Sequence, residues 1–68
     1  MTTVDARGYS CPEPVIMLRK AMMKKDAAYT VLVDNAASKE NVTRYAEHEG
    51  YVVSASEANG EYTLTMKK

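Results

Sequence analysis

The chain has 68 residues, nine basic and nine acidic side chains, and one cysteine. A chain of this length forms at most one domain with a single modest core, so any site lies near the surface. The balanced charge and the lack of a basic run argue against nucleic-acid binding through a phosphate-neutralising patch. One cysteine makes no internal disulfide and supplies too little for a structural zinc site, which favours a reducing cytoplasm.

No apolar run approaches the roughly 20 residues that span a bilayer. Residues 1–5 lack the basic and apolar blocks of a signal peptide. We therefore expect a single cytoplasmic domain over residues 1–68. We expect it to be monomeric on its own, without membrane contact, metal or cofactor.

The first half of the chain predicts a strand, a helix and a second strand. Residues 2–6 begin with β-formers and predict a short strand. Residues 12–25 predict a helix, because apolar side chains recur at spacings of three and four. Residues 29–34 are β-branched, aromatic and apolar, which predicts a central strand buried on at least one face. The apolar face of the helix comprises Val15, Leu18, Ala21 and Met22.

The second half predicts another helix. Ser38 is a good N-cap residue, and Glu40 would then lie in the first turn, where a negative charge is favoured. Gly50 has the usual role of ending the helix. Its apolar face comprises Val42, Tyr45 and Ala46.

Two closing strands are predicted over residues 51–57 and 61–66. The Asn59–Gly60 pair between them is a strong hairpin signal, because both turn positions need a positive φ. The order is β-α-β-α-β-β, with right-handed crossovers and parallel pairing of the first strands. The fold class is therefore α+β, a two-layer sandwich with a mixed four-stranded sheet and both helices on one face.

The single thiol lies at the predicted start of the first helix. Pro12 and Pro14 fall where helical N–H groups have no partner, so neither proline breaks a helical hydrogen bond. Cys11 takes the N-cap position, near the positive end of the helix dipole, where a thiolate is favoured. The Glu13 carboxylate and the missing Pro14 N–H oppose this, so we expect only a modest fall in the Cys11 pKa.

Cys11 could instead be a small apolar core residue. The polar, flexible approach through Gly8, Tyr9 and Ser10 favours a functional thiol. His48 lies near the end of the second helix, so a Cys–His catalytic pair is not expected. The pair Asp34 and Asn35 could bind a cation, but a turn or strand end is the better interpretation.

The segment "DARGYSCPEP", residues 5–14, closely resembles the signature of the TusA/SirA/YedF sulfur-carrier family. That signature is an Asp-x-x-Gly stretch followed by Cys-Pro-x-Pro at the start of the first helix. The resemblance implies that Cys11 accepts sulfane sulfur from a desulfurase or rhodanese-like donor, holds it as a persulfide and passes it to an acceptor protein. The supporting motif residues are Arg7, Gly8, Pro12, Glu13 and Pro14.

The second half, "VDNAASKENVTRYAEHEGY", looks more like the amino-terminal domain of YedF-type proteins of selenium metabolism. Selenium is therefore a second possible cargo. Whether such a carrier counts as an enzyme, a sulfurtransferase acting by thiol exchange, stays open. One alternative is a non-catalytic binding or regulatory module. A less favoured one is a small RNA-binding domain, since the fold is similar to the C-terminal domain of bacterial translation initiation factor three.

Overall fold

The structure, a computed structural model, describes residues 2–9, 13–24 and 26–68. The predicted N-cap Cys11, the following Pro12 and the predicted helix end at Lys25 therefore lie outside the described residues. The elements follow in the predicted order: β1 (Thr2–Asp5), α1 (Glu13–Met22), β2 (Ala28–Val33), α2 (Ala36–His48), β3 (Val52–Ala58) and β4 (Glu61–Lys67).

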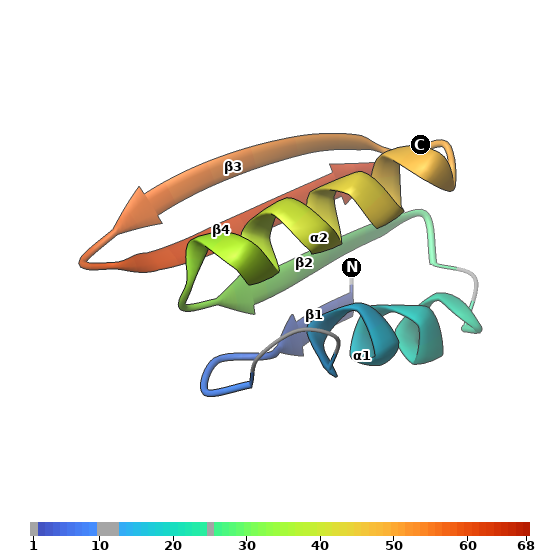
Figure 1. The fold of residues 1–68 in the computed structure, drawn as a ribbon. Coiled ribbons are helices and arrows are strands. Elements are labelled where there is room, and N and C mark those ends of the chain that lie inside the picture. The colour runs from blue at the N-terminus through green and yellow to red at the C-terminus, as the bar shows by residue number, and fades with distance from the viewer. Residues whose placement is uncertain (1, 10–12, 25) are drawn as a thin grey trace.

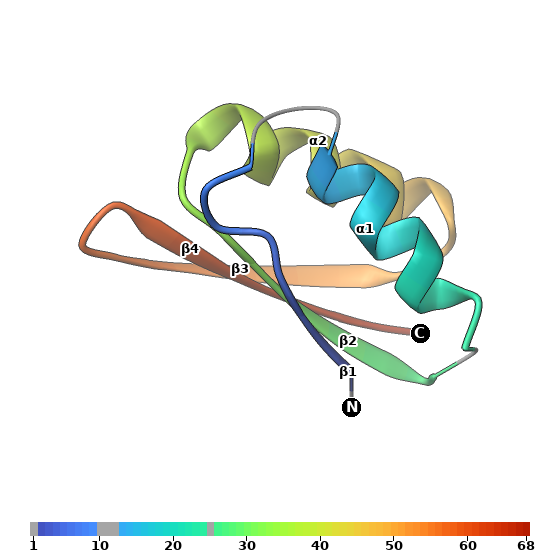
Figure 2. The same ribbon diagram turned by 90° about the horizontal axis from the view of Figure 1, so that it is seen from below.

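The four strands form one mixed sheet in the order β1-β2-β4-β3. Strands β1 and β2 pair in parallel, and β4 pairs antiparallel with both β2 and β3. Both helices cover the same face of the sheet and run in the same direction (Figures 1 and 2). The predicted two-layer sandwich and the central position of β2 are confirmed.

The core lies between the helices and the covered face of the sheet. Alternate residues of β2, Tyr29, Val31 and Val33, are fully buried, as the period of two along a strand requires. Leu18 of α1 meets them from one helix. The other side chains predicted for the two helix faces are buried or pack against this core, namely Val15, Ala21, Met22, Val42, Tyr45 and Ala46.

The turn glycines adopt the conformations that the sequence predicts. Asn59 and Gly60 have φ values of 55° and 78°, which match the two positive angles of a tight hairpin turn. Gly50, with a φ of 91°, follows the end of α2. Few other residues adopt such angles without strain, so these positions fix where α2 and β3 end.

The prediction for the start of α2 is wrong. Asn35, not Ser38, is the N-cap, and its side-chain oxygen accepts a hydrogen bond of 2.8 Å from the Ser38 N–H. Two residues able to cap lie close together in the sequence, and the earlier one has the extended backbone that a cap requires. Ser38 is instead fully buried in the first turn, and Glu40 falls beyond that turn.

Helix α1 also ends earlier than predicted. After Met22, the N–H groups of Met23 and Lys24 donate to carbonyls three residues back, at 3.2 and 3.1 Å. This tighter pattern is typical of the last turn of a helix. None of the helices described is long and apolar enough to cross a membrane.

Candidate functional site

The start of α1 combines one exposed and one buried residue. Glu13, the first helical residue, is exposed, and its position in the first turn suits an acidic side chain. Pro14 is fully buried. It occupies a position whose N–H would have no helical partner, so it contributes packing without breaking a helical hydrogen bond. The first turn of α1 is therefore held by the burial of Pro14.

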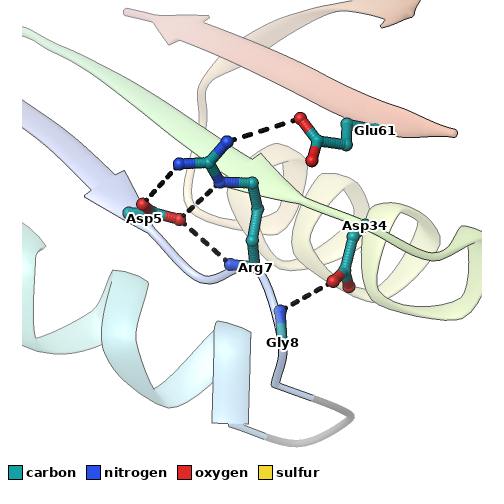
Figure 3. Close-up of polar contacts among 5 residues, drawn as sticks. All are labelled: Asp5, Arg7, Gly8, Asp34 and Glu61. Atoms are coloured by element: carbon teal, nitrogen blue, oxygen red, sulfur yellow. Dashed lines mark hydrogen bonds and ion pairs between the residues drawn. The ribbon is translucent and has the colours of Figure 1, made fainter. Parts of the chain in front are cut away.

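The loop after β1 is held to β2 and to the start of α2. The Ala6 N–H donates to the Leu32 carbonyl at 2.8 Å, which extends the parallel pairing by one bond. Gly8 then turns the chain with a φ of 86°, and its N–H donates to the Asp34 carboxylate at 2.7 Å (Figure 3). The Asn35 side-chain amide reaches the Tyr9 carbonyl at 3.5 Å. The chain is thus restrained up to Tyr9, two residues before Cys11.

Arg7 lies in a small cluster of charges across three segments. Its guanidinium donates twice to Asp5, at 2.8 and 2.9 Å, and once to Glu61 at the start of β4, at 3.4 Å (Figure 3). The side-chain hydrogen bond from Arg7 holds the pKa of Asp5 near 2, and the same contacts raise the pKa of Arg7. The positive charge of Arg7 is therefore directed to two carboxylates.

The structure describes four of the six predicted site residues, and these lie in two neighbouring segments of the chain. Arg7 and Gly8 lie in the loop after β1, and Glu13 and Pro14 lie at the start of α1. Cys11 and Pro12 fall outside the described residues. His48 is the last residue of α2, and because the helices run in the same direction it lies at the opposite end from Glu13 (Figure 1).

Sequence reasoning missed Asp34 and Asn35 as partners of this loop. The sequence predicts a turn or strand end at these two residues, which the structure has, but not their hydrogen bonds with Gly8 and Tyr9. No local signal pairs residues 26 positions apart. The available indication was one carboxylate and one carboxamide side chain directly after a strand that neighbours β1.

A shallow groove runs between the later turns of α1 and α2. Met23, 80% exposed, lies on its rim just after α1, at the far end of that helix from Glu13. Arg19 and Lys20 add positive charge to it.

Within residues 2–9, 13–24 and 26–68, no three histidine or acidic side chains gather where they could hold a metal ion.

Comparisons with known proteins agree with this arrangement. The sequence profile of the family described as "Sulfurtransferase TusA" matches residues 2–68. The crystal structure of a SirA-like protein from Desulfitobacterium hafniense superposes with a TM-score of 0.88 and 39% identity, covering 98% of this chain and 96% of that one. A protein of Methanocaldococcus jannaschii, named as a candidate sulfur carrier, is 34% identical over all of this chain and 95% of its own length.

The chain is a small two-layer β-α-β-α-β-β domain whose sequence has its one cysteine two residues before α1. The chain belongs to the TusA sulfurtransferase family.

Proposed function

We propose that this protein is a sulfur carrier that holds sulfane sulfur as a persulfide on Cys11. Family membership supports the carrier role in general. The observation that carries the specific proposal is the start of α1 at Glu13, two residues after the chain's only cysteine. A cysteine that precedes a helix in the sequence is favoured as a thiolate when its sulfur lies near the positive end of the helix dipole.

The transfer is an exchange between sulfur atoms and needs no cofactor. The Cys11 thiolate attacks the outer sulfur of a persulfide on the donor protein. A new S–S bond forms on Cys11 as the donor's S–S bond breaks, and the donor leaves as a thiolate. An acceptor thiolate then repeats the step and releases Cys11 as a thiolate, so no external oxidant or reductant is consumed.

The partners are a donor protein, such as a cysteine desulfurase or a rhodanese-like protein, and an acceptor protein. Such an exchange needs no deep pocket, because each sulfur stays bound to a protein throughout. The reducing cytoplasm is the compartment that suits a free thiol. Selenium is the second cargo to test, since residues 33–51 resemble YedF-type proteins.

The test is the intact mass of the protein after incubation with a cysteine desulfurase and cysteine. We expect a gain of one sulfur atom, reversed by a reductant. Because Cys11 is the only cysteine, no other thiol competes, and Cys11→Ser should gain nothing. An unchanged mass across several desulfurases and rhodaneses would favour the binding or regulatory module instead.

A further inference from the structure

We propose that Asp34 is a positioning residue for Cys11, acting through its hydrogen bond from the Gly8 N–H. This inference rests on the proposed carrier function of Cys11. Asp34 follows the last residue of β2, and Gly8 lies in the loop after β1. At 2.7 Å this is the shortest hydrogen bond between the β1 loop and the rest of the molecule, among those described.

The hydrogen bond restrains Gly8, a residue whose backbone is free to adopt many conformations. Gly8 has a φ of 86° and no side chain, so packing of its own cannot fix its direction. A Cβ at this position would meet nothing within 4 Å, so the glycine is required by its backbone angle and not by a close approach. The Asp34 carboxylate therefore replaces the missing packing and holds this turn.

A second contact reinforces the first. Asn35 is the N-cap of α2, and its side-chain oxygen accepts a hydrogen bond of 2.8 Å from the Ser38 N–H in the first turn. Its side-chain nitrogen faces the Tyr9 carbonyl at 3.5 Å and Asp34 Oδ1 at 3.3 Å. The 3.5 Å contact is long and weak, so the main restraint is Asp34. Asn35 in turn orients the Asp34 carboxylate.

The consequence for Cys11 follows from its position in the sequence between two restrained segments. The segment that holds Cys11 is bounded by Tyr9 on one side and by Glu13 and the buried Pro14 on the other. Asp34 restrains the first boundary, and the burial of Pro14 restrains the second. Thiol exchange requires the attacking sulfur to approach an S–S bond in line, and a misplacement of about 1 Å can cost up to a hundredfold in rate.

Three variants separate position from charge and from stability. Asp34→Ala removes the acceptor. Asp34→Asn keeps an oxygen acceptor and removes the charge. Asp26→Ala is the control, because Asp26 likewise accepts both side-chain and backbone bonds, among them those from the Thr2 hydroxyl at 2.8 Å and the Ala27 N–H at 2.7 Å. Thr2 begins β1 and Gly8 follows its end, so this control lies at the other end of that strand.

The readouts are sulfur transfer from a desulfurase, the pH profile of Cys11 alkylation by iodoacetamide, and urea unfolding. We expect Asp34→Ala to slow transfer about tenfold or more. We expect Asp34→Asn and Asp26→Ala to stay within about threefold of wild type, with the alkylation profile unchanged in all three. Rescue by asparagine shows that the hydrogen bond and not the charge is required, and urea unfolding shows whether lost stability accounts for the slow transfer of Asp34→Ala.

Equal transfer rates in Asp34→Ala and Asp26→Ala would overturn the proposal. So would an Asp34→Asn variant as slow as Asp34→Ala with a shifted alkylation profile, because charge would then be the cause. If Asp34→Ala does not fold, hydrogen exchange of the wild-type Gly8 amide decides, and an unprotected amide refutes the bond. A wild type that accepts no sulfur refutes the carrier function, whereas a loading wild type with an unimpaired Asp34→Ala refutes only the positioning role.

Discussion

Pro14 offers the clearest test of how the start of α1 is held. The sequence suggests that replacing both motif prolines leaves the fold intact, since neither breaks a helical hydrogen bond. The structure changes this expectation, because the Pro14 side chain is fully buried. Pro14→Ala removes about two buried carbon groups, each worth about 0.8 kcal/mol, and also frees the unfolded chain by about 0.4–1 kcal/mol.

Together these effects predict a loss of about 2 kcal/mol in the free energy of unfolding. A domain of 68 residues is stable by about 3–10 kcal/mol, so the variant stays folded at room temperature. For a domain of this size the midpoint of thermal unfolding should fall by roughly 10–15 °C.

The assay is urea unfolding at neutral pH, with the slope compared between variants to confirm that the denatured state is unchanged. Glu13→Gln is the matched control, since Glu13 is exposed in the same turn and should cost no more than about 0.5 kcal/mol. A Pro14→Ala protein as stable as Glu13→Gln would refute the argument that burial of Pro14 anchors the helix. Sulfur transfer measured below the unfolding midpoint then reports the effect on Cys11 separately.

Four further outcomes follow from the site. The Cys11 pKa should lie below the roughly 8.5 of a free cysteine but well above the roughly 3.5–4 of strongly activated thiols. Glu13→Gln should lower this pKa slightly, because it removes a negative charge near the thiolate. Thiolate absorbance against pH measures both effects. Because Asp5 and Glu61 hold the Arg7 guanidinium, Arg7→Ala should leave the Cys11 pKa unchanged; a rise would mean that the cation reaches the sulfur. The pKa of Asp5 is about 2 in the folded protein, against an ordinary 3.8. The ionised Asp5 therefore stabilises the folded state fully above about pH 4, and this contribution is lost as the pH falls towards 2. The free energy of unfolding of Asp5→Asn, measured in urea, should lack this part of the pH dependence. Binding to transfer RNA should be weak and should disappear with added salt, and submicromolar affinity at physiological salt would contradict this.

The parts of the fold that the sequence predicts well depend on local chemistry. Asn59 and Gly60 define their turn through backbone angles that few other residues tolerate, and residues 29–34 have a strand composition that needs no partner to be recognised. The alternation of buried side chains in β2 then follows from the period of a strand. Motif residues that carry a family resemblance can also be assigned from the sequence directly.

The parts that it misses depend on contacts between distant segments. Ser38 and Asn35 both have side chains able to cap a helix, and only the folded chain shows that Ser38 is buried against the core. The same holds for the burial of Pro14, which no helical hydrogen-bond argument reveals. The bond between Gly8 and Asp34 joins two loops whose proximity follows from the parallel pairing of β1 and β2.

The position of β4 has a consequence for synthesis of the protein. Strand β3 pairs only with β4 among the described strands, and β2 depends on β4 for its antiparallel neighbour. A nascent chain that has not yet released residues 61–67 therefore has a two-stranded parallel pair and one unpaired strand, which is too little sheet to be stable. The domain can complete its fold only after its last strand leaves the ribosome. Any partner protein would accordingly meet the complete four-stranded sheet only after β4 has been released.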